Sequence, residues 1–333
     1  FWVRGIGTFG ANSSALVLID GLEGRLSDID PADVESFSIL KDASATAVYG
    51  VRGANGVVLV TTKRGKSDRL RVTARVNFTV SQLKHLPEYL GAYDYAKLAN
   101  EARVVSGMTP LYDETALNLI QYGLDPDLYP DVNWQDEILN KTSLQQTYYV
   151  SAQGGGNVAK YFISLNASNE GSAYKQDPSS KYKSNVAYQT YGYRSNLDIS
   201  VTKTTDLYLG VDGFISSTGY PGGANTDYIW YAQSSLTPLT IPTMYSGGIF
   251  PSYDKNMYSP YIVLNHTGFG KKEEYKNMVT LALNQDLSMI TPGLKVRVQG
   301  ALNTTANKEE YRRLWPEMYN ASERDVNGNL VLV

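Results

Sequence analysis

Residues 70–81 read LRVTARVNFTVS, and their alternation decides the fold class. Apolar side chains occupy every second position from Leu70 to Val80, and polar or charged side chains stand between them. A period of two places the two sets on opposite faces of a β-strand. The segment therefore predicts a strand with one apolar and one polar face.

The same alternation recurs six more times along the chain. The further predicted strands are 144–153, 159–169, 188–201, 206–217, 276–288 and 293–304. Most are close to the roughly 9–11 residues that a tilted strand needs to cross a bilayer. Short links alternate with long connections, as they do in outer-membrane barrels. The short links are 154–157, 202–205 and 291–293, and the long connections are 82–143, 170–187 and 218–275. A soluble β-sandwich or lectin-like domain is the alternative, but it fits such long loops poorly.

Seven strands alone would leave two open sheet edges in the membrane. Each unpaired backbone group there costs several kcal/mol, so two edges would cost on the order of tens of kcal/mol. Native stability is only about 5–15 kcal/mol. We therefore expect further strands to close the barrel. The chain opens at Phe1 without Met and ends in a strand-like run at Val333, so we expect it to be part of a longer protein.

Composition excludes several classes of function. The chain has 333 residues and a net charge of −3, which gives no electrostatic footprint for nucleic acid. It has no cysteine, which excludes disulfide bonds and a thiol nucleophile. His85 and His266 have no second histidine at ligand spacing, so we expect no metal site and no cofactor. No Ser/His/Asp set or close carboxylate pair suggests an enzyme, and 26 Tyr with 29 Gly favour an all-β chain.

Residues 1–66 differ from the rest and predict a small α+β unit. Asp30 and Pro31 suggest a helix start, with Asp30 as the N-cap. The other predicted elements are strands at 15–19, 36–40 and 57–62, a turn at Asp20-Gly21, and a helix at 43–49 that Asp42 caps and Gly50 ends. GIGTFG at 5–10 matches a dinucleotide fingerprint, but a strand follows it instead of a helix, so we expect a flexible loop there.

Residues 1–65 closely resemble the plug domain of TonB-dependent outer-membrane transporters, specifically the SusC/RagA family of the Bacteroidetes. The matching stretches include LVLIDG at 16–21, ILKDASATAVYG at 39–50 and VRGANGVVLVTTKRG at 51–65. The residues that carry the resemblance are Arg4, Gly5, Asp20, Gly21, Lys41, Asp42, Tyr49, Gly50, Arg52, Asn55 and Gly56.

The resemblance implies a 22-stranded barrel whose lumen is closed by the plug. Residues 1–66 would be most of the plug, and residues 69–333 the first seven transmembrane strands with their extracellular loops. It also implies TonB-dependent import of an oligosaccharide or, alternatively, a peptide, across the outer membrane of a Gram-negative bacterium. The partners would be a SusD-like surface lipoprotein, outer-membrane lipid, and TonB through a segment upstream of residue 1. A surface adhesin or lectin-like protein is the competing interpretation, although it has no use for a unit that fills a lumen.

Aromatic residues are dense in the connection 218–275, where flat amphipathic rings suit stacking on sugars or gripping peptides. The ligand-binding candidates are Tyr220, Tyr228, Trp230, Tyr231, Tyr245, Tyr253 and Tyr258. The same rings could instead pack the loop on itself. The charges of the N-terminal unit predict a wet, movable contact with a polar barrel wall lined by Arg71, Arg75, Lys295 and Arg297.

Overall fold

A computed structural model describes residues 15–41, 48–53, 55–66, 68–184, 186–253 and 257–333. Its N-terminal unit, residues 15–66, contains a four-stranded sheet in the order β2-β1-β4-β3. The strands are β1 (Leu16–Ile19), β2 (Leu22–Glu23), β3 (Val34–Leu40) and β4 (Val57–Thr62). β1 runs parallel to β4, and β2 and β3 are antiparallel to their neighbours. The predicted strands of this unit are confirmed.

Three single 3₁₀ turns complete the unit: η1 (Leu26–Asp28), η2 (Pro31–Asp33) and η3 (Gly50–Gly53). Asp30 caps η2 by accepting from the backbone N–H of Ala32 at 2.7 Å, as the sequence predicts. The helix predicted to start there is a single turn, because the chain becomes extended again at Val34. Most of the predicted helix at 43–49, and all of GIGTFG, lie outside the described residues.

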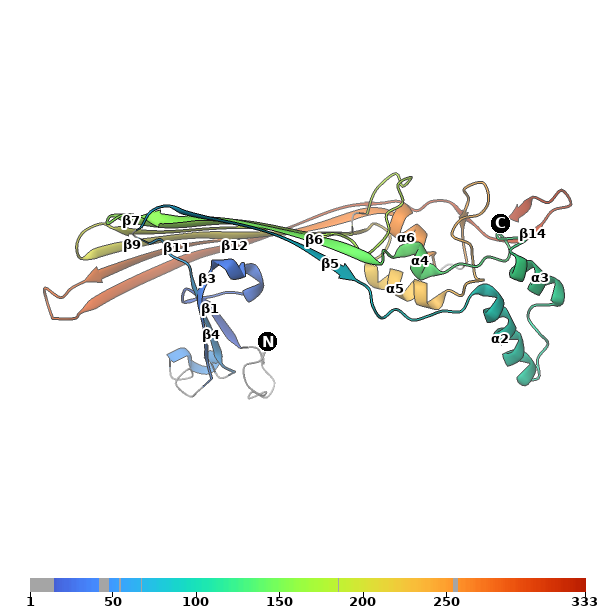
Figure 1. The fold of residues 1–333 in the computed structure, drawn as a ribbon, viewed down its shortest axis with the longest axis horizontal. Coiled ribbons are helices and arrows are strands. Elements are labelled where there is room, and N and C mark those ends of the chain that lie inside the picture. The colour runs from blue at the N-terminus through green and yellow to red at the C-terminus, as the bar shows by residue number, and fades with distance from the viewer. Residues whose placement is uncertain (1–14, 42–47, 54, 67, 185, 254–256) are drawn as a thin grey trace.

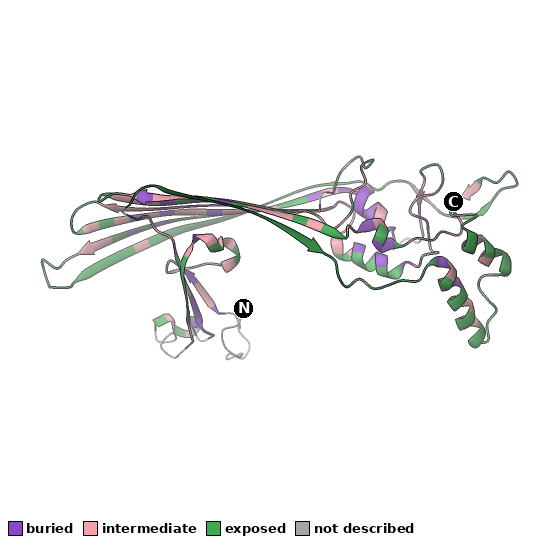
Figure 2. Cartoon of the chain, viewed as in Figure 1, coloured by how far each residue is buried: buried purple, intermediate pink, exposed green. Residues whose placement is uncertain are grey.

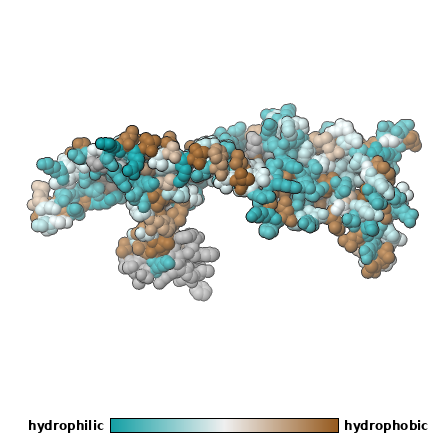
Figure 3. All heavy atoms as spheres, viewed as in Figure 1, coloured by the Kyte–Doolittle hydropathy of each residue, from teal (hydrophilic) through white to brown (hydrophobic). Residues whose placement is uncertain are grey.

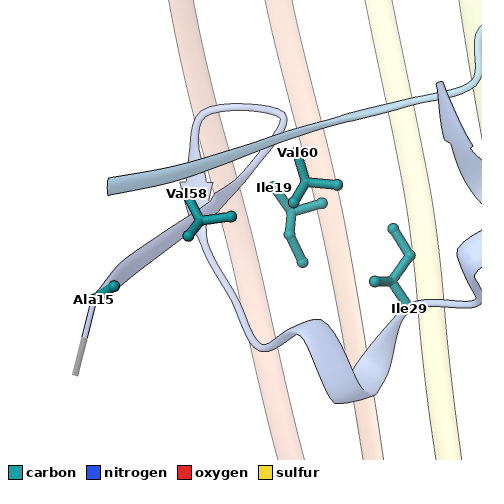
Figure 4. Close-up of a cluster of buried hydrophobic side chains, with 5 residues drawn as sticks. All are labelled: Ala15, Ile19, Ile29, Val58 and Val60. Atoms are coloured by element: carbon teal, nitrogen blue, oxygen red, sulfur yellow. The ribbon is translucent and has the colours of Figure 1, made fainter. Parts of the chain in front are cut away.

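The core of the N-terminal unit is aliphatic (Figure 4). Side chains from β1, β4 and the segment after η1 pack together, and they are Ala15, Ile19, Ile29, Val58 and Val60. Leu18 and Val57 form a second cluster with Tyr49 and Leu40. Val57 and Val58 are both fully buried, so β4 is covered on both faces.

A second, larger sheet has seven antiparallel strands in the order β12-β11-β9-β8-β7-β6-β5. The strands are β5 (Arg71–Gln82), β6 (Thr142–Gly155), β7 (Ala159–Glu170), β8 (Tyr188–Ser200), β9 (Thr205–Pro221), β11 (Gly268–Asp286) and β12 (Lys295–Arg313). Each strand pairs with its neighbour in the sequence, which confirms all seven predicted strands.

β11 and β12 are longer than the alternation predicts. The prediction started β11 at residue 276 and ended β12 at residue 304, whereas they extend to Gly268 and Arg313. The extensions are charged on both strands, so the apolar period is lost there. Opposite charges instead face each other across the pair, with Lys271 opposite Glu310 and Glu273 opposite Lys308. Such cross-strand pairs support a sheet without apolar alternation.

The long connections, which the sequence predicts as loops, contain helices. Between β5 and β6 lie α2 (Ala92–Val105), α3 (Glu114–Tyr122) and α4 (Trp134–Ile138). Between β9 and β11 lie α5 (Thr226–Ser235), β10 (Phe250–Pro251) and α6 (Pro260–His266). After β12 come β13 (Met318–Tyr319), which pairs with β10, and the hairpin of β14 (Ala321–Arg324) and β15 (Leu330–Leu332). Within the described ranges, every helix is too short or too polar to cross a membrane.

The elements are arranged along one elongated sheet (Figure 1). The N-terminal unit lies against one face of the strands, and the helices gather at the end of the sheet away from the short turns. The two outermost strands, β5 and β12, are exposed along almost their whole length (Figure 2). Among the described strands, each of these two pairs on one side only.

Candidate functional site

The large sheet has an inward face, which contacts the N-terminal unit, and an outward face. Arg194, Asn196 and Asp198 of β8 all contact the unit, which fixes the even positions of β8 as inward. The outward face is apolar, and apolar side chains gather on the strands away from the N-terminal unit (Figure 3). Its exposed members include Val72, Val76, Phe78, Val80, Ile163, Leu165, Val279, Leu281, Leu283, Val296, Val298 and Leu302.

A buried ionic cluster joins the N-terminal unit to the large sheet. Asp33, only 2% exposed, accepts a hydrogen bond of 2.9 Å from the Tyr149 hydroxyl of β6. The Arg194 guanidinium lies 3.5 Å from Asp33 and 3.6 Å from Asp212 of β9. Burial raises the pKa of Asp33, although the Tyr149 hydroxyl and Arg194 oppose this. The Nε of Arg194 makes no hydrogen bond in the described part of the chain. The guanidinium is therefore held by charge attraction to Asp33 and Asp212 more than by well-aligned hydrogen bonds.

A second polar cluster centres on Thr62 at the end of β4, which is fully buried. Its hydroxyl donates to Asp20 at 2.5 Å and accepts from the Asn196 side chain at 3.0 Å. Asn196 also donates to the carbonyl of Lys63 at 2.7 Å and accepts from the Tyr208 hydroxyl at 2.9 Å. The chain of bonds thus passes from a turn of the N-terminal unit through β4 to β8 and β9.

Further ion pairs surround these two clusters. Arg64 lies 3.2 Å from Asp198 and stacks on the Tyr208 ring at 3.6 Å. Asp28 accepts from Arg25 and, at 3.0 Å, from Lys276 of β11. Burial opposes ionisation of Asp28, but these two cations outweigh it and lower its pKa.

Of the four positions predicted to line the wall, Arg75 makes a contact with the N-terminal unit in the described residues. Arg75 of β5 lies 3.4 Å from Asp30, which confirms the predicted contact of charge with charge. Lys295 and Arg297 share a face of β12 with Gln299, whose side chain donates to the Asp20 carbonyl at 3.5 Å. The contact is therefore polar on β5, β6, β8, β9, β11 and β12.

The motif residues of the N-terminal unit have mainly conformational roles where they are described. Asp20 and Gly21, with φ of 51° and 86°, form the turn between β1 and β2. Gly50 and Gly56 also have positive φ, at 62° and 94°, which glycine adopts without strain.

The remaining motif residues occupy varied environments. Arg52 forms an ion pair with Glu23, Asn55 is buried, Tyr49 packs against the second aliphatic cluster, and Lys41 is exposed. Arg4, Gly5 and Asp42 lie outside the described residues.

The aromatic ligand candidates divide into buried and exposed side chains. Tyr245 is 3% exposed, and its hydroxyl accepts from the backbone N–H of Ala321. Tyr228 and Tyr258 pack partly into the cluster of buried side chains between α4, α5 and α6. Tyr220 of β9 donates to Glu309 of β12 at 2.5 Å. Trp230, Tyr231 and Tyr253 are 44%, 57% and 54% exposed, so these three are the candidates that solvent reaches most freely.

His266 has a carboxylate partner that sequence reasoning did not find. Its Nε2 lies 3.1 Å from Asp177, which also accepts from the Tyr261 hydroxyl at 2.6 Å. Burial lowers the pKa of His266, which favours the neutral ring. The partner comes from the connection between β7 and β8, 89 residues away, so no local spacing could have indicated it.

A contact between three separate loop segments, the junction of Arg324, was also not predicted. Arg324 of β14 contacts Asp125 at 2.6 Å and Asp127 at 2.9 Å, and Asp127 accepts from the backbone N–H of Ser246 at 2.8 Å. Three segments far apart in the sequence meet there. Within the described ranges, no group of three or more His, Asp or Glu residues could hold a metal ion.

Comparison with known proteins gives the family. The sequence profile of the TonB-dependent receptor plug domain matches residues 1–57. The chain is 30% identical over 266 residues to TonB-dependent receptor P26 of Formosa agariphila, covering 78% of this chain and 24% of that protein. It is 30% identical over 210 residues to TonB-dependent receptor SusC of Bacteroides thetaiotaomicron, covering 60% of this chain and 19% of that protein.

The chain belongs to the TonB-dependent transporters of the SusC/RagA type. The structure is also similar to the RagAB peptide importer in its closed-closed state, with a TM-score of 0.72 and 21% identity over 94% of this chain and 37% of that one. That likeness shows the fold, a plug followed by antiparallel barrel strands. The chain spans about a quarter or less of the length of the curated relatives named above. The N-terminal unit is hereafter the plug, and the large sheet the wall.

Proposed function

We propose that the protein to which this chain belongs imports a nutrient across the outer membrane of a Gram-negative bacterium, driven by TonB. A glycan is the first candidate for the cargo and a peptide the second. The relatives support this as TonB-dependent receptors, and one similar structure is described as a peptide importer. The proposal involves no covalent chemistry and no enzyme activity.

The observation that carries the proposal is the polar contact between plug and wall. The contact contains five polar side chains that are at most 5% exposed: Asp33, Thr62, Arg194, Asn196 and Tyr208. Each forms a hydrogen bond or an ion pair with another polar group of the contact. Water can replace hydrogen bonds of this kind, so their net loss costs less than the loss of an aliphatic core. A plug held in this way closes the lumen at rest and can move when it is pulled.

We assign residues 1–66 to the plug and residues 69–333 to the wall with its extracellular loops. β5 and β12 each have an unpaired edge among the described strands, and such edges are too costly in hydrocarbon to remain open. Further strands of the same protein would close the barrel. A SusD-like surface lipoprotein would cover the loops, and TonB would pull on a segment upstream of residue 1.

The experiment is native mass spectrometry of the detergent-extracted protein, combined with uptake assays in cells with and without TonB. We expect a lipoprotein to co-purify and uptake of a glycan or peptide to require TonB. A surface adhesin is the alternative function, favoured only by the exposed Trp230, Tyr231 and Tyr253. Glycan binding without TonB-dependent uptake would support the adhesin and overturn the importer.

A further inference from the structure

A cavity of about 360 Å³ lies among the extracellular helices. Three segments line it: the approach to α2 at 88–91, the start of α4 at 131–134, and the end of α5 with the turn that follows, 233–238. Two of these segments are joined by a hydrogen bond, since the backbone N–H of Val132 donates to the Pro238 carbonyl at 3.1 Å. These two sides of the cavity are therefore fixed relative to each other.

Two buried polar atoms in the lining have no partner. Trp134 is 2% exposed and Gln233 is 3% exposed, and both line the cavity. The indole Nε1 of Trp134 and the Oε1 of Gln233 make no hydrogen bond in the described part of the chain. Buried polar atoms are nearly always paired in folded proteins, so each unpaired atom calls for an explanation.

Local packing prevents Trp134 from turning to find a partner within the protein. Its ring packs with Leu236 and Ile241 in a buried cluster. Asn133 holds the start of α4 by accepting from the backbone N–H groups of Gln135 and Asp136. Trp134 is therefore held in the lining of the cavity whether or not a partner is present.

The two unpaired atoms are one donor and one acceptor. A secondary amide presents one C=O acceptor and one N–H donor on opposite sides of a planar group, so it complements this pair, whereas a sugar hydroxyl has its donor and its acceptor on one oxygen atom. The rim adds Tyr89 and Leu90, which are 46% and 49% exposed and offer apolar contact. Glu88 and Asp131 also line the cavity, and no Lys, Arg or His stands among its described lining residues. This charge pattern disfavours an anionic ligand.

We propose that this cavity is a subsite for a secondary amide group of the cargo. Trp134 donates to the amide carbonyl of the ligand, and Gln233 accepts from its N–H. The amide belongs to a peptide main chain or to the acetamido group of an N-acetylhexosamine. The inference rests on the proposed import function, because it assigns the chemistry of the cargo.

The test is calorimetric titration of the full-length protein in detergent with three probes: diacetylchitobiose, cellobiose, and trialanine blocked by N-acetyl and methylamide groups. We expect one of the two amide-bearing probes to bind and cellobiose to bind at least several-fold more weakly. The probe that binds identifies the source of the amide. Equal binding of cellobiose and diacetylchitobiose with no binding of the blocked peptide, or no binding of either amide probe, would overturn the subsite.

Substitutions in the lining test whether the amide probe binds in this cavity. Trp134→Phe and Gln233→Met each remove one polar partner, and each should weaken the bound amide probe about threefold to tenfold, the usual net effect of one hydrogen bond. Gln233→Met nearly conserves side-chain volume, which separates lost hydrogen bonding from lost packing. Tyr122→Phe, at the exposed end of α3 and outside the cavity lining, is the control and should bind as the wild type does.

Unchanged affinity in both cavity variants would overturn the proposal. TonB-dependent uptake is measured separately in the same strains. Uptake that persists while the amide probes fail to bind rejects the subsite alone. Loss of TonB dependence rejects the import function.

Discussion

The interior of the plug and its contact with the wall are built from different side chains. The interior contains Ala15, Ile19, Ile29, Val58 and Val60, which carry no polar side-chain atoms (Figure 4). The contact contains Asp33, Thr62, Arg194, Asn196 and Tyr208, which are as deeply buried but polar. Water entering the interior would expose apolar surface with nothing to offset it, whereas water entering the contact can replace the lost hydrogen bonds. The difference suggests that the plug can leave the wall while keeping its own fold.

The largest expected effect comes from breaking the interior. Val58→Asp places a carboxylate at a fully buried position without a partner, which should destabilise the plug by about 4 kcal/mol or more. Cells that carry this variant should admit vancomycin through an open lumen. Val48→Asp is the control, because Val48 is 72% exposed in the same unit. Equal vancomycin resistance in the two variants would contradict the assignment of Val58 to the plug core.

The next largest effect tests the ionic part of the contact. Arg194→Met leaves the carboxylates of buried Asp33 and half-buried Asp212 without their cation, which should weaken the binding of the plug to the wall, its seating, by about 3–5 kcal/mol. The chain has no cysteine, so Ser164→Cys, at a position that is 1% exposed on the inward face of β7, supplies a single reporter. Its alkylation should begin at a lower urea concentration in the Arg194→Met background.

Neutralisation provides the control for the ionic cluster. Adding Asp33→Asn and Asp212→Asn to Arg194→Met removes the uncompensated charges and should recover much of the lost resistance to urea. The plug interior should stay folded in Arg194→Met, which amide exchange in β1 and β4 can measure. Simultaneous loss of exchange protection and of seating would show that the plug cannot detach as an intact unit.

A smaller effect tests the neutral hydrogen bonds of the contact. Thr62→Val removes the hydroxyl that joins Asp20 to Asn196 and should weaken seating by about 1–3 kcal/mol. Thr61→Val is the matched control, because Thr61 is the exposed neighbour on the same strand and should change stability by less than about 0.5 kcal/mol. The same cysteine reporter measures both variants. Thr62→Val should lower the urea concentration at which alkylation begins less than Arg194→Met does. An equally large shift would contradict the ranking of the ion pairs above the neutral hydrogen bonds.

The wall could be predicted from the sequence because its signal is local. The alternation of Val72, Val76 and Val80 with Arg71 and Arg75 defines both faces of β5 without any knowledge of its neighbours. The aliphatic strand 57–62 and the Asp20-Gly21 turn are local in the same sense.

The helices of the long connections were missed although local signals for some of them exist. Asp113 caps α3, and Gly123, with φ of 59°, ends it. The length of this connection predicts a loop, whereas its capping residues indicate a helix.

Contacts between distant segments could not be predicted from spacing. Arg194 and Asp33 are 161 positions apart, and only the packing of the plug against the wall brings them together. Aromatic composition indicated Tyr245 as a ligand candidate, but its burial and its bond to Ala321 depend on a segment 76 residues later. The unpaired atoms of Trp134 and Gln233 are likewise visible only in the folded loops.

The smallest expected effect comes from a third kind of contact, the ionic junction of Arg324, on the surface, with the more covered Asp125 and Asp127. The hydrogen bond from Arg324 lowers the pKa of Asp125 below its ordinary value of 3.8. A carboxylate whose pKa is lowered by folding contributes stability above its ordinary pKa, and it loses that contribution as the pH falls through the folded value. At pH 7, Arg324→Gln should therefore raise the rate of proteolysis in the hairpin of β14 and β15 only modestly, because solvent reaches the Arg324 end of the junction and screens its charge.

Acid supplies the decisive comparison for this junction. As the pH falls through the lowered pKa of Asp125, the wild type loses the Asp125 contact that the variant lacks, so their amide exchange rates in the hairpin should converge. Arg69→Gln, an exposed arginine far from the hairpin in the sequence, should match the wild type at every pH. A difference between Arg324→Gln and wild type that persists in acid would mean that Arg324 acts through Asp127 or through its bond to the Gly328 carbonyl, and that the contact with Asp125 contributes little.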